Sequence, residues 1–215
     1  MMLVRRMLVM LMMLMAVSAG AQTVIKGRAS VVLEGRVAQV TVDLGGGFIV
    51  GFQFKDQRLN PLSWVSDEPG PAHPMGHFLC LDRWGAPSDA ESKNGMPFHG
   101  EASHVQWTVV RQPGASGDAI QAEMAATLPM AGFKVARNLY LAEGAALLRV
   151  TESVTNNNKL GRVYNMVQHP SIAPPFLDAS TVVDANARKG FMQSSALPNP
   201  EEPAVFWPQA LQDGR

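Results

Sequence analysis

Strict alternation of apolar and polar residues is the pattern that most constrains how this chain can fold. Val40, Val42 and Leu44 alternate with Thr41 and Asp43, and after the turn at 45 to 47 an apolar residue stands at every second position from 48 to 54. Successive side chains of a strand point to opposite faces of a sheet, so each run presents one apolar face. Three consecutive glycines supply the positive φ angles that a tight turn needs. The segment therefore predicts a β-hairpin in which Phe48, Val50, Phe52 and Phe54 share one face.

The same period of two recurs further along the chain. Apolar residues stand at every second position from 120 to 128, and again from 148 to 154 with Glu152 as the exception, before the polar turn at 156 to 158. Weaker strand patterns cover 105 to 111 and 133 to 141, and no segment after residue 21 shows the 3.6-residue period of an amphipathic helix. Many short strands separated by turn residues predict an all-β fold, an antiparallel β-sandwich.

The N-terminal segment has the pattern of a secretory signal peptide over residues 1–21. Arg5 and Arg6 precede an apolar stretch from 7 to 17, and Ala19-Gly20-Ala21 has the small-residue form of a cleavage site. The stretch is shorter than the roughly 20 residues that span a bilayer. We therefore expect a periplasmic or secreted protein with no stable membrane insertion after cleavage; an uncleaved N-terminal anchor is the alternative.

The remaining chain has a size and charge typical of one globular domain. The sequence has 215 residues with 18 basic and 18 acidic side chains, and removal of the signal would leave 16 basic side chains against 18 acidic ones. This balance argues against a nucleic-acid partner. We interpret residues 22–196 as one β-sandwich domain and residues 197–215 as a proline-rich tail or the truncated end of that domain. Cys80 is alone, which excludes an intrachain disulfide and predicts a small buried apolar side chain.

Two histidines stand where strand-like segments stop. Gly100 follows His99 and Pro170 follows His169, and both neighbours are residues that end strands. This arrangement places each imidazole at the open end of a β scaffold, where it could bind a sugar. The segment from 66 to 100 contains three of the five histidines and Trp84, so it has the character of a binding rim. The alternative is that each histidine is structural and caps a strand end.

The order of these segments resembles the galactose mutarotase (aldose 1-epimerase) superfamily from about residue 31 to about residue 183. The turn at 45 to 49 resembles the early glycine-rich hairpin of that family, and His99-Gly100-Glu101-Ala102 resembles its His-Gly stretch. The segment 150 to 156, followed by His169-Pro170, resembles the stretch that leads to the second family histidine. The resemblance implies a large antiparallel β supersandwich that binds a sugar or glycan. It implies no cofactor and no metal.

The resemblance also implies roles for particular residues. In mutarotation the C1 hydroxyl loses a proton while the ring oxygen gains one, so an acid and a base must stand on either side of the hemiacetal. His169 would be the general acid at the ring oxygen and His99 a hydrogen-bond partner of the sugar. Substrate hydroxyls and the sugar face would be held by a second group of residues: Asp82, Arg83, Trp84 and Glu101.

The family base is a glutamate in a C-terminal strand, and this chain lacks a clear counterpart. Glu201 and Glu202 lie in a proline-rich stretch without a strand pattern, so neither is assigned as the base. The chain is therefore either a truncated enzyme or a non-catalytic carbohydrate-binding or structural protein.

Other chemistries fit the sequence less well. His73 and His77 have a spacing that a helix could use to bind metal, but Pro74 and Gly76 argue against that helix. The chain contains neither a Gly-x-Ser-x-Gly elbow nor a Gly-x-x-x-x-Gly-Lys-[Ser/Thr] phosphate loop. Trp64, Trp84 and Trp107 could stack on sugar faces, although tryptophans are more often part of a core.

Overall fold

The computed structural model describes residues 23–25, 27–57, 59–62, 76–172, 174–184, 186, 188–191 and 204–206. These residues form antiparallel strands with one short helix, so the predicted all-β class is confirmed. The predicted signal peptide lies outside the described residues, as do Trp64, His73, Glu201, Glu202 and Trp207.

Twelve strands and one helix make up the described structure. In chain order they are β1 (Thr23–Ile25), β2 (Arg28–Glu34), β3 (Ala38–Asp43), β4 (Ile49–Phe54), β5 (Phe78–Leu81), α1 (Asp89–Lys93), β6 (Thr108–Ser116), β7 (Ala119–Leu128), β8 (Phe133–Ala142), β9 (Leu148–Asn156), β10 (Met166–His169), β11 (Lys189–Phe191) and β12 (Ala204–Phe206).

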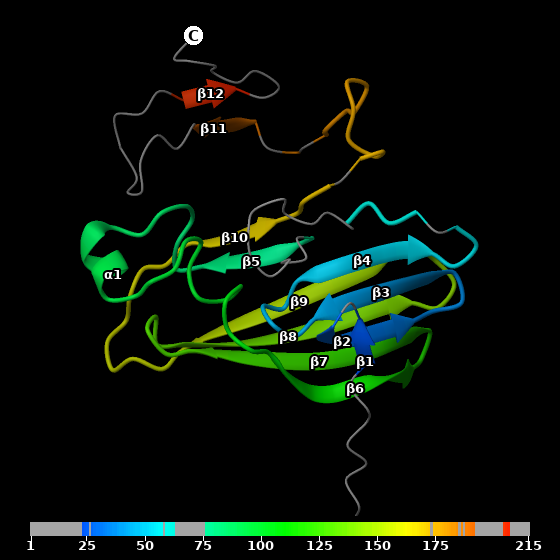
Figure 1. Ribbon diagram of the computed structural model, residues 1–215, viewed down its shortest axis with the longest axis horizontal. Coiled ribbons are helices and arrows are strands. Elements are labelled where there is room, and N and C mark those ends of the chain that lie inside the picture. The colour runs from blue at the N-terminus through cyan, green and yellow to red at the C-terminus, as the bar shows by residue number, and fades with distance from the viewer. Residues whose placement is uncertain are drawn as a thin grey trace, which may run out of the picture.

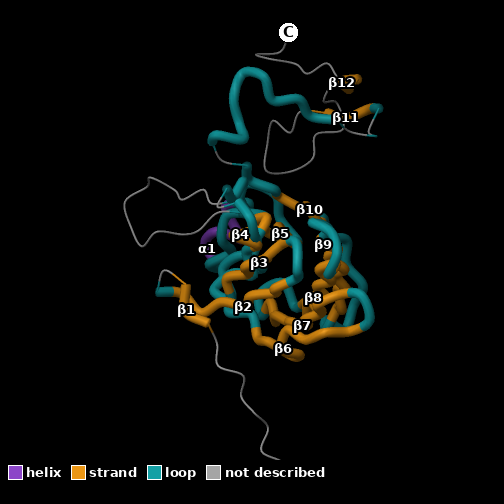
Figure 2. Tube along the Cα trace, turned by 90° about the vertical axis from the view of Figure 1, so that its right-hand side faces the viewer, coloured by secondary structure: helices purple, strands orange, loops and turns teal. Residues whose placement is uncertain are grey.

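Two four-stranded antiparallel sheets form the body of the molecule (Figures 1 and 2). The first has the strand order β1-β2-β3-β4, and the second has the order β6-β7-β8-β9. Buried side chains of both sheets form one continuous apolar cluster, to which β3 contributes Val40 and Val42 and β8 contributes Phe133 and Leu139. This is a sandwich-like arrangement, because each sheet buries one face against the other.

The alternation read from the sequence corresponds to burial in most strands. In β7 the side chains of Ala122, Met124, Ala126 and Leu128 are buried, and in β8 every second side chain from Phe133 onward is buried. The weaker pattern from 105 to 111 corresponds to the first part of β6, which begins at Thr108. Cys80 is fully buried in β5, as predicted.

A β-bulge in β4 overturns one detail of the predicted hairpin. Thr41 pairs with Gly51 but Val42 pairs with Ile49, so Val50 is the extra residue on its strand. Phe48 and Val50 consequently pack in a small second cluster, whereas Phe52 packs against the main core. The prediction of one shared face for positions 48 to 54 is therefore wrong, because the bulge reverses the facing of the side chains that follow it.

One ion pair lies within the core of the second sheet. Arg137 and Glu152 are directly opposite each other on β8 and β9, and each occupies a core-facing position. Their side chains are 0% and 3% exposed, and Arg137 Nη2 lies 2.7 Å from Glu152 Oε1. The Arg137 guanidinium also covers the Trp107 ring at 4.2 Å and donates to the carbonyl of Gly47. Glu152, the exception in the alternating pattern, is thus the partner of a buried cation.

A two-stranded ribbon of β5 and β10 extends from the first sheet. A single antiparallel bridge between Ile49 and His77 connects β4 to the ribbon. Directly paired residues share a face, so Phe78 and His169 lie on one face, and Leu79 and Gln168 lie on the other. The ribbon therefore presents two different surfaces, one apolar and aromatic and one directed toward the main core.

Two small elements lie outside the sandwich. Helix α1 begins with a capping box in which Ser88 and Glu91 satisfy each other's backbone amides, and it buries no side chain. Strands β11 and β12 pair with each other beyond the β5–β10 ribbon (Figure 1). We interpreted residues 197–215 as a proline-rich tail, and β12 adds a short strand within it.

Candidate functional site

His99 and His169 come together in the structure although 70 positions separate them in the sequence. Their ring centroids are 5.5 Å apart, and the two planes meet at 77°. His169 is the last residue of β10, and His99 lies in the loop that follows α1. Both residues are partly exposed. The fold therefore brings both predicted site histidines to one place.

Three aromatic rings surround the two imidazoles. The Trp84 ring lies 4.7 Å from that of His99 and 4.9 Å from that of His169. Phe78 lies 4.4 Å from His169, and Phe98 packs edge-on against His99 at 4.2 Å. We call these five side chains the imidazole cluster: Phe78, Trp84, Phe98, His99 and His169. The cluster combines apolar ring faces with nitrogen atoms that can donate or accept hydrogen bonds, a combination typical of small-molecule sites.

Two hydrogen bonds to Gly85 hold His99 in place. The His99 amide donates to the Gly85 carbonyl at 2.9 Å, and the Gly85 amide donates to His99 Nδ1 at 3.0 Å. His99 adopts a φ of 65°, which is uncommon for a residue other than glycine and indicates a conformation fixed by its surroundings. Because Nδ1 accepts a hydrogen bond from the Gly85 amide, the neutral ring carries its own proton on Nε2. His99 can therefore donate a hydrogen bond to a ligand.

Burial lowers the pKa of both imidazoles. Desolvation, followed by repulsion from His169 and His104, lowers the pKa of His99 to about 4. Desolvation, followed by repulsion from His77, lowers the pKa of His169 below 6.5. The Nδ1 atom of His169 is buried and has no hydrogen-bond partner among the described residues, which adds to the cost of charging this ring. Both rings are consequently mainly in the neutral form at pH 7.

The lowered pKa of His99 predicts a stability loss in mild acid. The unfolded chain binds a proton near pH 6.5 and the folded chain only near pH 4. The unfolded state therefore holds more protons between these values, and stability falls as the pH decreases through this window. We expect wild type to lose about 1 kcal/mol more than His99→Gln between pH 7 and pH 4, after allowance for solvent screening. Urea unfolding of both proteins at several pH values measures this difference; equal losses would contradict it.

Three of the predicted substrate-binding residues have protein partners in the structure. Both carboxylate oxygens of Asp82 accept from Arg162, at 2.7 and 2.8 Å. Arg83 donates to Glu91, which holds the pKa of that carboxyl at about 2. Glu101 is 2% exposed and accepts from the amides of Met130 and Ala131 in the turn between β7 and β8. These contacts favour structural roles for Asp82, Arg83 and Glu101, whereas Trp84 lies in the imidazole cluster.

The other aromatic and histidine candidates lie elsewhere. Trp107 is 1% exposed and donates from Nε1 to the carbonyl of Ala102, so it is a core residue. His104 is exposed, and its Nδ1 lies 3.1 Å from Ser103 Oγ. His77 immediately precedes β5, and its Nε2 is 2.7 Å from Gln168 Oε1. Among the described residues, no group of three or more His, Cys, Asp or Glu side chains is placed to hold a metal ion.

The sequence analysis identified neither two aromatic members of the cluster nor the buried ion pair of Arg137 and Glu152. Phe78 and Phe98 were not singled out, and the sequence carries no signal that separates them from core phenylalanines. Arg137 and Glu152 did carry a signal, because each is a charged residue at an apolar position of an alternating strand. Two opposite charges in neighbouring apolar rows are typical of a buried cross-strand pair.

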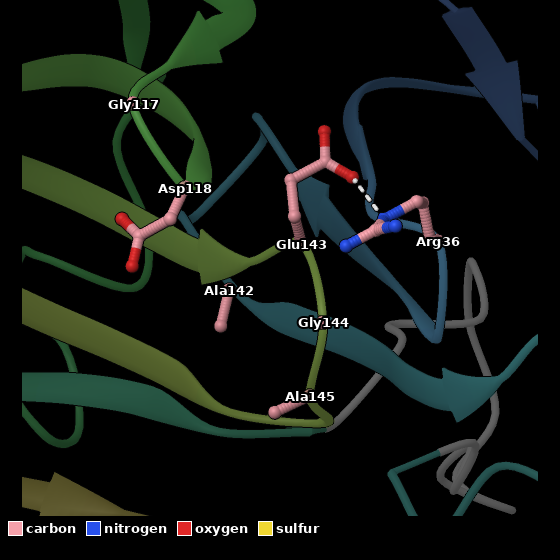
Figure 3. A pocket seen from close by; sticks show the side chains of 7 residues that line it. All are labelled: Arg36, Gly117, Asp118, Ala142, Glu143, Gly144 and Ala145. Atoms are coloured by element: carbon pink, nitrogen blue, oxygen red, sulfur yellow. Dashed lines mark ion pairs between the residues drawn. The ribbon is translucent and has the colours of Figure 1, made fainter.

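A cavity of about 530 Å³ lies among strand-connecting turns, away from the imidazole cluster (Figure 3). Arg36 comes from the β2–β3 turn, Asp118 from the β6–β7 turn and Glu143 from the β8–β9 turn. Arg36 Nε lies 3.4 Å from Glu143 Oε2, but the arginine side chain is 78% exposed, so this ion pair contributes little stability. None of the predicted site residues lines this cavity.

Comparison with protein-family models, with curated proteins and with solved structures found no match for this chain. The resemblance to the mutarotase superfamily therefore stays a prediction from the sequence. Within the described ranges, no helix has the length and apolar character that crossing a bilayer requires.

Proposed function

We propose that the imidazole cluster binds a sugar, either free or as part of a glycan, and that the protein is a mutarotase-like carbohydrate-binding protein. The observation that carries this proposal is the convergence of His99, His169 and Trp84, with ring centroids 4.7 to 5.5 Å apart. An aromatic face suits the C–H face of a sugar ring, while the nitrogen atoms of two imidazoles suit its hydroxyls.

The two imidazoles have different roles in this proposal. His99, with its proton on Nε2, donates a hydrogen bond to a sugar oxygen. His169 carries the proton that the ring oxygen gains when the hemiacetal opens, and the C1 hydroxyl proton goes to a base that the described residues do not identify. Closure of the ring after rotation about the C1–C2 bond reverses both proton transfers and yields the other anomer.

One observation favours a second candidate, a protein that binds sugar without turnover. Since burial lowers the pKa of His169, only a minority of the protein holds the acidic proton at pH 7. A neutral imidazole still forms hydrogen bonds with a bound sugar, so binding needs no proton on His169. The signal-peptide pattern would place either activity in the periplasm or outside the cell, an expectation that comes from the sequence alone.

Replacement of His169 tests the proposed site. We expect calorimetry with several aldoses to show binding to wild type, and His169→Ala to weaken that binding about tenfold through loss of a polar contact and a ring contact. Lys134→Ala is the control, because this exposed side chain lies on β8 and is not part of the cluster. Its binding should equal that of wild type.

Polarimetry then separates the two candidates. A mutarotase accelerates the change in optical rotation of a fresh aldose solution, whereas a binding protein leaves the rate unchanged. Aldose binding that His169→Ala leaves unaltered would reject the site itself, whatever the polarimetric result.

A further inference from the structure

A second cavity lies on the opposite face of the β5–β10 ribbon. It has a volume of about 460 Å³, within the range of small-molecule pockets. Its walls come from β4, from β9 and from the ribbon, so it occupies the open side of the sandwich between the edges of the two sheets. Gln168 lines it, whereas the adjacent His169 faces the imidazole cluster. The two sites are therefore separated by the thickness of the ribbon.

The walls of this cavity are mainly apolar. Ile49 and Phe52 of β4, Leu148 and Val150 of β9, and Met166 of β10 all line it. Most of these side chains are only partly buried, and Met166 is 38% exposed. An apolar body that entered the cavity would cover them, which is favourable by about 25 cal/mol for each Å² of apolar surface removed from water.

Three hydrogen-bonding side chains line the cavity as well. His77 Nε2 lies 2.7 Å from Gln168 Oε1, and Gln168 Nε2 donates to Glu152 Oε2 at 2.6 Å. The other oxygen of Glu152 accepts from Nε of the buried Arg137 at 2.7 Å. A carboxylate oxygen can accept more than one hydrogen bond, so Glu152 Oε2 and the Gln168 amide retain free acceptor capacity.

The charges around these three side chains favour a ligand that is a neutral hydrogen-bond donor. Among the described residues, the cation in contact with Glu152 is Arg137, which is fully buried and also bonded to the Gly47 carbonyl. His77 is neutral at pH 7, because desolvation lowers its pKa. An anionic ligand would meet a carboxylate and no accessible cation, whereas a neutral N–H or O–H group would find acceptors.

We propose that this cavity binds a neutral amphipathic molecule, which places an apolar or aromatic body against β4 and β9 and donates a hydrogen bond to Glu152 or Gln168. The site is independent of the sugar site, because it uses the other face of the ribbon and shares none of its side chains.

A matched pair of fluorescent probes tests this proposal. N-phenyl-1-naphthylamine is neutral, apolar and carries one N–H donor, and 8-anilinonaphthalene-1-sulfonate is the same molecule with a sulfonate added. We expect the neutral probe to bind with a Kd on the order of 100 µM, as its size allows. The sulfonate should bind at least about tenfold more weakly, because it brings a negative charge toward Glu152. Equal binding of both probes would overturn the proposal.

Substitutions in β9 and β10 locate the bound probe. Val150→Phe fills the cavity and should weaken binding of the neutral probe at least about tenfold. Thr151→Phe adds the same ring to the exposed outer face of β9 and should leave the Kd within about twofold of wild type. Met166→Trp blocks the cavity from a position where the side chain is already 38% exposed, so it provides the same test if Val150→Phe does not fold. Unchanged probe binding to a folded, blocked variant would overturn the proposal.

Discussion

Replacement of Arg137 by methionine is expected to lower the free energy of unfolding by about 3–5 kcal/mol. The substitution keeps an unbranched side chain over Trp107 but removes the charge that faces Glu152. Glu152 would then be a buried carboxylate without its cation, and the Gly47 carbonyl would lose its donor. Loss of one partner from a buried ion pair costs far more than the pair itself contributes, because the remaining charge stays desolvated.

A double variant separates the cost of an orphaned charge from a loss of packing. Arg137→Met combined with Glu152→Leu removes both charges, and we expect it to recover most of the lost stability in urea unfolding. Arg111→Met is the control, since Arg111 pairs with Glu123 on the exposed surface, where both side chains are about 40% exposed, and it should cost less than about 1 kcal/mol. A double variant no more stable than Arg137→Met would indicate that the packing of the guanidinium on Trp107 dominates instead.

The strand pattern predicted most of the fold because alternation reports directly which face of a strand is buried. β7 shows this clearly, since Ala122, Met124, Ala126 and Leu128 occupy one buried face as the pattern required. The bulge at Val50 was not predictable in the same way. A bulge depends on how two strands pair, and the alternation in one strand carries no information about the residue opposite.

The candidate site was only partly predictable for a related reason. His99 and His169 were recognisable because each is next to a residue that ends a strand. Their proximity depends on the pairing of β10 with β5 and on the loop that holds His99 against Gly85. The partners of Asp82, Arg83 and Glu101 were not predictable, because charged residues in a loop look the same in the sequence whether they bind a ligand or another side chain. Asp82, for example, accepts a hydrogen bond from Arg162, which lies 80 positions later in the sequence.

Replacement of Gly100 by alanine is expected to disturb the candidate site strongly, although Gly100 lies outside the imidazole cluster. Gly100 follows His99 with a φ of 78°, and a Cβ there would lie 2.3 Å from the backbone oxygen of Leu81. A left-handed conformation costs an alanine about 1–2 kcal/mol, and a clash with backbone adds about 1–3 kcal/mol, because backbone in a strand cannot move aside as a flexible side chain does. We therefore expect the free energy of unfolding to fall by about 3 kcal/mol.

Gly117→Ala is the matched control for this substitution. Gly117 has a φ of 64°, and a Cβ at that position would meet no atom within 4 Å, so only the conformational cost of about 1 kcal/mol applies. The two variants differ in the clash alone, and the difference in their denaturant midpoints measures it. Relief of the clash requires the loop at 99 to 101 to move away from β5, which would carry the His99 ring away from His169. The NMR signals of the imidazole protons should accordingly change in Gly100→Ala and remain unchanged in Gly117→Ala. If both variants have equal stability and unchanged imidazole signals, the loop does not depend on glycine at position 100.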